Sequence, residues 1–291
     1  MKFHLYLPQM RLSHDAIIDR AQAAEAAGFE GIGFMDHLAP PLAYEQPMWE
    51  AMSTAAWTLA RTERLLVGHL VLCDAFRHPA MLARQATSLD HASGGRFEVG
   101  LGWGSVPAEF DTFGVGSTEA RVRVDRLEES LAIIRGLWSG ESIDHHGKHF
   151  TLVSARQQPI PTSPIPITIG GVGPRTLQLV REYADWWNIP VHELGRLDEL
   201  RDRAGSAARL SVQQMIALVP SESERPAVTG LVRKRFGSTR FFPNIAVGTA
   251  PELIEHFAHL ESIGVERSYA WFADFAPLST IEAFTEVIEN W

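Results

Sequence analysis

The chain has 291 residues, a formal net charge of −9 at pH 7, and 45% hydrophobic against 21% charged residues. This composition is typical of a globular protein with a large core, and the acidic balance disfavours nucleic acid or anionic membranes as partners. No apolar run approaches the roughly 20 residues that span a bilayer, and the N-terminus lacks the apolar segment of a signal peptide. The single cysteine, Cys73, cannot form a disulfide within the chain, so we expect a reducing, cytoplasmic location.

Residues 65–104 contain one complete strand–helix–strand unit, around which the other elements can be arranged. Pro79 opens its helix, where the missing N–H is harmless, and the pair Gly94-Gly95 ends it. Apolar runs and helical periodicity extend this pattern through the N-terminal third of the chain. They predict strands at 2–7, 31–35, 65–72 and 96–100, and helices at 13–27, 48–60 and 79–93.

The same alternation continues to the C-terminus, interrupted by a small hairpin predicted at 143–152. It predicts strands at 167–169, 185–189, 212–219 and 267–272, and helices at 119–138, 174–183, 195–208, 222–236, 249–264 and 278–291. About eight strand–helix alternations without a break in composition predict an α/β fold, a single (β/α)8 TIM barrel domain over residues 1–291 with inserted segments. A doubly wound open sheet is the alternative.

Ligands of such barrels bind at the carboxyl ends of the strands, so the residues that follow each strand are the candidates for a site. This end of the predicted barrel is rich in aromatic residues and glycine. It has few carboxylates that could hold a metal, which disfavours a metal-dependent hydrolase. The candidates are Pro8, Gln9, Asp36, His37, Cys73, Asp74, Phe76, Arg77, Gly102, Trp103, Gly104, Ser105, Glu109, Gly170, Gly171, Val172, Gly173, Asn188, Pro190 and Asp274.

The segment from Gly170 to Arg175 carries the clearest physical mechanism. A strand, a Gly-Gly-x-Gly turn and a helix N-terminus direct free N–H groups at an anion such as phosphate. A simple tight turn gives the same spacing, and the spacing leaves both interpretations open. The pattern Gly100-x-Gly-x-Gly104 is a weak match to a dinucleotide fingerprint, and we favour instead the close approach of a flat ring to bare backbone.

Asp36 and His37 follow the second predicted strand and form a candidate pair for proton transfer, because an imidazole titrates near neutral pH. A structural histidine fits the same pattern, and neighbouring residues on a strand point to opposite faces. The remaining candidates have simpler interpretations. We interpret His145, His146 and His149 as solvated and Cys73 as a core residue, and Ser105 lacks a nucleophile elbow. Arg233-Lys234-Arg235 is interpreted as a solvated helix face, with contact to an anionic cofactor tail as the alternative.

Several motifs, taken together in their order and spacing, resemble those of the luciferase-like flavin and deazaflavin oxidoreductases. They run through most of the chain, and their order and spacing are specific for the family. They are less specific for the cofactor and give almost no information about the substrate. They are Ala27-Gly28-Phe29-Glu30, Met35-Asp36-His37, Arg77-His78-Pro79-Ala80, Leu89-Asp90, Ser93-Gly94-Gly95-Arg96-Phe97, Gly100-Leu101-Gly102-Trp103, Glu109, Phe113-Gly114, Leu127-Glu128-Glu129, Leu137-Trp138, Pro164-Ile165-Pro166, Gly170-Gly171, Tyr183-Ala184-Asp185, Trp187-Asn188 and Val247-Gly248-Thr249.

The resemblance implies a (β/α)8 barrel that binds reduced FMN or the 5-deazaflavin coenzyme F-420, with F-420 preferred. The ring would contact Leu70, Val71 and Leu72, near a non-proline cis peptide at Leu70–Val71, together with Gly102, Trp103 and Gly104. The phosphate would lie on Gly170, Gly171, Val172 and Gly173, and His37 would transfer a proton or orient the substrate beside the ring. Family members usually form homodimers, and some use a separate flavin or F-420 reductase.

We therefore predict an oxidoreductase that transfers hydride between coenzyme F-420 and a small organic substrate. The alternatives are a two-component monooxygenase that uses reduced FMN and oxygen, and a non-catalytic flavin-binding barrel. Sugar-phosphate dehydrogenation is doubtful, because Ser105 stands where such family members carry a glutamate. The substrate pocket should be apolar and aromatic, formed by Gln9, Trp49, Phe76, Trp103, Asn188 and Trp271.

Overall fold

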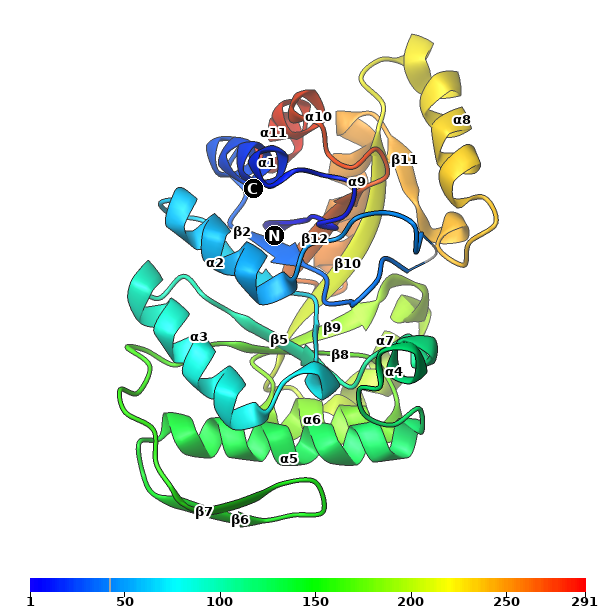
Figure 1. Ribbon diagram of the computed structural model, residues 1–291. Helices are drawn as coiled ribbons and strands as arrows, with labels where there is room; N and C mark the ends of the chain where they lie inside the picture. The colour runs from blue at the N-terminus through cyan, green and yellow to red at the C-terminus, as the bar shows by residue number, and fades with distance from the viewer. Residues whose placement is uncertain (42) are drawn as a thin grey trace.

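The computed structural model describes residues 1–41 and 43–291. In this part of the chain, parallel strands form one continuous sheet that closes into a barrel surrounded by helices (Figure 1). The strands are β1 (Lys2–Tyr6), β2 (Gly31–Phe34), β3 (Leu66–His69), β4 (Leu72–Cys73), β5 (Val99–Gly102), β8 (Ile167–Gly170), β9 (Trp186–Pro190), β10 (Arg209–Leu218), β11 (Ala246–Gly248) and β12 (Arg267–Phe272).

The barrel closes between its third strand, which is split into β3 and β4, and its fourth strand, β5. The order of the sheet is β3-β2-β1-β12-β10-β9-β8-β5-β4, with β11 added beside β10. A parallel bridge between Val67 of β3 and Phe97, just before β5, joins the two ends of this order. The predicted (β/α)8 barrel is therefore confirmed, and the open doubly wound sheet is not found.

The helices cover the outside of the barrel, and their predicted ends are largely confirmed. Ser13 caps the first helix by accepting a hydrogen bond from the Ala16 amide, Gly94 ends the third in a left-handed conformation, and Thr249 forms a capping box with Glu252. The helices are α1 (His14–Ala26), α2 (Ala51–Arg61), α3 (Pro79–Ser93), α4 (Pro107–Phe113), α5 (Ala120–Trp138), α6 (Pro174–Tyr183), α7 (Leu197–Ala204), α8 (Arg225–Phe236), α9 (Ala250–Ser262), α10 (Leu278–Ala283) and α11 (Thr285–Ile288).

Side chains alternate between the two faces of each strand. Those that point outward, such as Phe3 and Leu5, pack against the helices in the main core. Those that point inward at the N-terminal half of the barrel are polar and tightly paired. Arg267 donates two hydrogen bonds to the Glu98 carboxylate, at 2.9 and 3.0 Å, and its guanidinium stacks 3.9 Å from the centre of the Trp186 ring. This half is therefore filled by side chains, which leaves the opposite end for a ligand.

Several elements differ from those predicted. The fourth strand of the barrel is Val99–Gly102 rather than 96–100, and the Arg96 side chain donates to the carbonyls of Leu59 and Leu65. The helix predicted at 195–208 is a 3-10 turn, Val191–Arg196, followed by α7, and β10 begins earlier than predicted. Helix α4 and strand β11 were not predicted, since both are too short to show periodicity. The closing helix is broken into α10 and α11.

Two segments extend the barrel. The predicted hairpin is confirmed as β6 (Ile143–His146) and β7 (Thr151–Ala155), and it lies beside α5. Helix α8 and β11 form an excursion after the carboxyl end of β10, before the chain returns through α9. Figure 1 shows α8 and the hairpin on opposite sides of the molecule. No helix within residues 1–41 and 43–291 is long and apolar enough to cross a membrane.

Candidate active site at the carboxyl ends of the strands

His37, in the loop after β2, pairs with Glu109 of α4. The His37 Nδ1 atom lies 2.7 Å from the Glu109 Oε2 atom, and the side chains are 17% and 3% exposed. A carboxylate only accepts hydrogen bonds, so Nδ1 carries the hydrogen and Nε2 is the free atom of the neutral ring. No hydrogen bond to Nε2 is formed by the residues that the structure describes. His37 therefore presents a proton acceptor, in a fixed tautomer, at the carboxyl end of the barrel.

Glu109 is held as a charged group by the same loop that carries His37. Its Oε1 atom accepts hydrogen bonds from the amides of Leu38, at 2.7 Å, and Ala39, at 3.3 Å. Burial alone would raise the pKa of the Glu109 carboxyl, but the hydrogen bonds from His37 and from these two amides outweigh it, so the pKa lies below its ordinary value. In the sequence, Glu109 follows the predicted fourth strand and no motif gives it a role. It is 72 residues from His37, and no local spacing marks the pair.

Asp36 does not orient His37, as the candidate pair required. Its carboxylate accepts two hydrogen bonds from the Arg77 guanidinium, at 2.5 and 3.0 Å, and one from the Cys73 amide at 2.8 Å. Asp36 thus ties the end of β2 to the end of β4. Asp36 pairs with Arg77 and His37 pairs with Glu109, which agrees with the expectation that neighbouring residues on a strand point to opposite faces. Cys73 is buried, which raises the pKa of its thiol to about 12 and fits the predicted packing role.

The third strand of the barrel is split into β3 and β4, and the break lies at the position predicted for the cofactor ring. The bond between Leu70 and Val71 is a non-proline cis peptide, which confirms the position expected from the resemblance. Leu70 packs with Tyr6, Met35 and Tyr269, and Val71 is only partly buried beside this group. The interruption therefore presents apolar side chains at the mouth of the barrel.

The glycines of the Gly100-x-Gly-x-Gly104 pattern are explained by protein packing rather than by room for a ring. A Cβ atom on Gly100 would lie 1.9 Å from the His69 carbonyl oxygen, and one on Gly102 would lie 2.7 Å from a methyl of Val71. Gly104 has a φ of +84°, and a Cβ there would meet Phe110 at 2.6 Å. Packing within the protein is therefore a sufficient reason for these glycines. Contact of a ring with their backbone stays a prediction.

Trp103 is held between these glycines by a buried arginine that the sequence analysis did not identify. The Arg123 guanidinium lies 5.0 Å from the Trp103 ring centre and 4.5 Å from that of Phe110. Its Nε and Nη1 atoms have no hydrogen-bond acceptor among the described residues, so the two ring faces are their partners. Arg123 thereby fixes the Trp103 ring, which is partly exposed, beside α4.

The Gly170–Gly173 turn behaves differently from the glycines of β5. A Cβ atom on Gly170 would meet only the Asn188 carbonyl, at 3.7 Å, and one on Gly173 only Thr176, at 3.5 Å. Neither glycine has a positive φ, so the protein itself does not require glycine at these two positions. Gly173 caps α6 without a side-chain hydrogen bond, and the amides of Val172 and Gly173 donate to no acceptor in the described chain. The turn therefore has open space and free donors, as an anion site needs.

The predicted substrate residues divide into two groups. Asn188 and Trp271 lie at the mouth: the Asn188 Oδ1 atom accepts from Ser211 at 3.2 Å, and Trp271 packs 5.4 Å from Tyr6. Phe76 is partly buried, with its ring 6.1 Å from Phe110.

Two of the predicted substrate residues serve other contacts. The Gln9 amide is used entirely by the backbone of Met35 and Trp49, and Trp49 stacks on His14 and donates to the Leu12 carbonyl at the surface. Both therefore fasten loops, and their role as walls of a substrate pocket stays a prediction.

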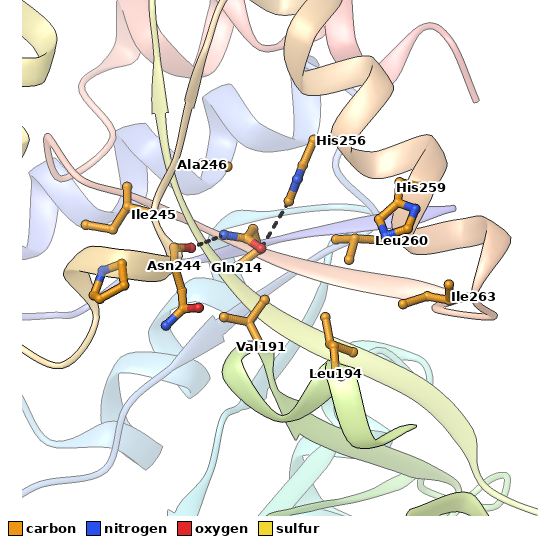
Figure 2. Close-up of a pocket in the computed structure, with 12 residues that line it drawn as sticks. Val191, Leu194, Gln214, Asn244, Ile245, Ala246, His256, His259, Leu260 and Ile263 are labelled. Atoms are coloured by element: carbon orange, nitrogen blue, oxygen red, sulfur yellow. Dashed lines mark hydrogen bonds between the residues drawn. The ribbon is translucent and has the colours of Figure 1, made fainter. Parts of the chain in front are cut away.

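A separate pocket of about 500 Å³ lies outside the barrel, and none of the predicted site residues lines it (Figure 2). At its centre, the buried Gln214 donates to the Asn244 carbonyl at 2.8 Å and accepts from His256 at 3.1 Å. Gln214, Asn244 and His256 thus satisfy one another's hydrogen-bonding groups. Its lining comprises Val191, Leu194, Gly195, Gln214, Pro243, Asn244, Ile245, Ala246, His256, His259, Leu260 and Ile263.

The residues at the mouth fit a flat, phosphate-bearing redox cofactor. The open Gly170–Gly173 turn offers free amides to a phosphate, while Leu70, Val71 and Trp103 offer apolar surface to a ring. Within the described ranges, no group of three or more His, Cys, Asp or Glu side chains is placed to hold a metal ion.

Comparison with known proteins agrees with this geometry. The family model for luciferase-like monooxygenases matches residues 1–213. The chain belongs to the luciferase-like monooxygenase family. An F-420-dependent hydroxymycolic acid dehydrogenase of Mycobacterium tuberculosis is 37% identical over 184 residues, which are 62% of this chain and 50% of that protein. An F-420-dependent glucose-6-phosphate dehydrogenase of Microbacterium testaceum is 32% identical over 170 residues, 58% of this chain and 50% of that protein.

These alignments span only about half the length of the two curated relatives. Solved structures extend the likeness to the whole luciferase-like fold. An F-420-dependent secondary alcohol dehydrogenase, in complex with an F-420-acetone adduct, superposes with a TM-score of 0.84 at 19% identity, covering 99% of this chain and 98% of that chain. The monooxygenase RslO1 of Streptomyces bottropensis superposes with a TM-score of 0.83 at 19% identity, covering 100% and 99%. At these identities the structures support the fold alone.

Proposed function

We propose that this protein is an oxidoreductase that binds coenzyme F-420 at the mouth of its barrel and acts on a small organic substrate. The observation that carries the proposal is the open Gly170–Gly173 turn, at the same end of a luciferase-like barrel as the His37–Glu109 pair. The F-420-dependent relatives favour this cofactor. FMN remains the second candidate, because a phosphate cradle made of backbone amides would accept either cofactor.

The chain's own residues would bind and orient the reactants. The amides of Val172 and Gly173 would hold the phosphate, and Leu70, Val71 and Trp103 would contact the ring. When bound, the cofactor supplies hydride transfer to or from the substrate. The His37 Nε2 atom would accept or return the accompanying proton, while Glu109 holds the ring in the required tautomer and stabilises its protonated form. Ser105 makes a sugar phosphate a doubtful substrate.

The cofactor that the purified protein retains tests this proposal directly. We expect the released cofactor to have the mass and absorbance spectrum of F-420, and a titration to show tighter binding of F-420 than of FMN. Tighter binding of FMN, with turnover only in air, would instead support the two-component monooxygenase. Failure of both cofactors to bind would contradict the proposed function, and binding without turnover of any alkene, imine or aldehyde would leave a non-catalytic flavin-binding barrel.

Three further expectations belong to this proposal. We propose one catalytic domain over residues 1–291, a homodimer, and a cytoplasmic location in which a separate reductase supplies reduced cofactor. The free thiol of Cys73 is compatible with a reducing compartment. Light scattering of the purified protein would test the dimer, for which a measured mass of about 32 kDa would be contrary evidence because the chain is 32.3 kDa.

A further inference from the structure

The excursion after β10 has a charge opposite to that of the whole chain. Residues 225–251 contain five Arg or Lys residues and no Asp or Glu, in a chain whose net charge is −9. The segment also lies beyond residues 1–213, which the family model matches. Its charge is therefore a property of this chain that the family comparison does not explain.

Aromatic side chains connect this segment to the mouth of the barrel. Trp271, near the carboxyl end of β12, lies 5.4 Å from Tyr6, which points into the barrel. The rings of Phe241 and Phe236 lie 5.4 and 6.3 Å from Trp271 on its other side. All three, Phe236, Phe241 and Trp271, are partly exposed, and we call them the rim aromatics. They extend the apolar surface of the mouth onto the excursion.

Cations border the rim aromatics. The Arg240 guanidinium lies 5.3 Å from the Phe241 ring centre. Arg235 donates to the Ala273 carbonyl at 2.7 Å, and its guanidinium lies 5.4 Å from the Phe275 ring, with Arg11 5.9 Å from the same ring. These interactions place three positive charges from two loops and α8 around the carboxyl end of β12.

The charges of these cations are not neutralised by carboxylates. In the described chain, no ion pair is formed by Arg11, Arg233, Lys234, Arg235 or Arg240, whereas Arg225, at the start of α8, pairs with Glu222 and Glu252. The acidic residue of the neighbouring loop, Asp274, accepts hydrogen bonds from the Ala276 amide and the Thr280 hydroxyl. A positive field beside apolar surface attracts an anion that also has an apolar body.

We propose that the substrate is an amphipathic organic anion, whose apolar body lies on the rim aromatics and whose anionic group faces Arg235 and Arg240. The inference rests on the proposed function, since it names the substrate class of that same site. It also assigns Arg235 and Arg240 as specificity-determining residues, which changes the prediction that Arg233-Lys234-Arg235 is merely a solvated face.

A pair of fluorescent probes tests the charge selectivity without any turnover. Anilinonaphthalenesulfonate carries a sulfonate, and N-phenyl-1-naphthylamine has the same aromatic body without charge. We expect the wild-type protein to bind the sulfonate more tightly, and Arg235→Gln with Arg240→Gln to weaken it about tenfold while the neutral probe is unchanged. Arg235→Lys with Arg240→Lys should restore most of the affinity, because the charge is kept. Equal loss of both probes, or no loss of either, would overturn the proposal.

Two control variants locate the effect. Lys148→Gln removes an exposed charge from the hairpin, on the opposite side of the molecule, and should change neither probe. Phe241→Ala removes a rim aromatic and should weaken both probes. If Phe241→Ala leaves both affinities unchanged, the probes bind elsewhere, for instance in the pocket of Figure 2, and the assignment of the site is wrong.

Titration of F-420 and FMN into the same variants separates this inference from the proposed function. We expect their affinities to change by less than about twofold in the double glutamine variant. If cofactor affinity falls as far as sulfonate affinity, the cations serve the cofactor, which overturns the substrate assignment and leaves the proposed function standing. If the wild-type protein binds neither cofactor, the proposed function is contradicted. The difference in affinity between the two probes still shows whether the rim aromatics and the two arginines select an anion.

Discussion

At the scale of single residues, the arrangement of His37 determines what chemistry the mouth can perform. Its ring is fixed through Nδ1 by a carboxylate that is itself held by two backbone amides, so Nε2 stays aimed and available. Asp36 precedes His37 in the sequence, but its carboxylate accepts two hydrogen bonds from Arg77 and has a structural role. A general base must first be oriented toward the proton that it accepts, and only then does its pKa matter. Glu109 provides this orientation for the His37 ring.

We expect His37→Ala to lower turnover about 100-fold, because the proton acceptor is lost, while the cofactor dissociation constant changes less than about twofold. Glu109→Gln should lower turnover about tenfold, because the amide no longer stabilises a protonated ring. Steady-state kinetics and cofactor titration measure both quantities. Glu119→Gln, an exposed position at the start of α5, is the matched control. Unchanged turnover in His37→Ala would remove this residue from the mechanism.

At the scale of elements, two glycine-rich turns that look similar in the sequence have different physical causes. Gly100 and Gly102 of β5 must be glycines because the chain at the break between β3 and β4 approaches them so closely that a methyl group has no room. The turn after β8 has room for side chains at Gly170 and Gly173, and its glycines instead leave backbone amides uncovered. Only the second turn is therefore evidence for a ligand.

This difference predicts opposite outcomes for two substitutions. Gly170→Val should leave the unfolding transition nearly unchanged and weaken cofactor binding at least about tenfold, because its side chain would cover the open turn. Gly100→Ala should destabilise the protein by about 3 kcal/mol or prevent folding, because its Cβ would overlap the His69 carbonyl. Urea denaturation and cofactor titration separate the two. Normal cofactor affinity in Gly170→Val would argue against the phosphate site.

At the scale of the whole molecule, the barrel is divided into a filled half and a ligand-binding half. The Arg267–Glu98 pair, Trp186, Tyr269 and His4 fill the N-terminal half with polar and aromatic groups that pack on one another. Such a buried network is stable only while each charge keeps its partner. The N-terminal half can therefore support the mouth, where the apolar surface and the free donors lie.

Two buried histidines, His4 in the N-terminal half and His69 at the carboxyl end of β3, make the stability of the barrel sensitive to pH. Burial, together with the charge of Arg267, lowers the pKa of His4 to about 4, and burial lowers that of His69 to about 4. The ordinary value is 6.5, so between these pH values the unfolded chain binds more protons and stability falls as the pH falls. We expect each ring to remove roughly 3 kcal/mol of stability between pH 6.5 and pH 4.

Urea denaturation across this pH range measures the effect. His69→Phe and His4→Gln should each flatten the pH dependence, because a group that does not titrate replaces one that does. His146→Gln, on the exposed strand of the hairpin, should leave it unchanged. A stability that is constant from pH 6.5 to pH 4 in the wild-type protein would contradict the assignment of neutral, buried rings.

The cis peptide position was expected from the resemblance to the luciferase-like family alone. The sequence by itself determined the type and order of nearly all long elements, the closed barrel, and the glycine-rich turn as a candidate phosphate site. These follow from local periodicity, capping residues and motif spacing, which act within a few residues of the chain. Only the tertiary structure decided which side chains meet. Strand register and barrel closure bring together residues that are far apart in the sequence. They pair His37 with Glu109 and Asp36 with Arg77. They also leave no room for a side chain at Gly100 but open space at Gly170.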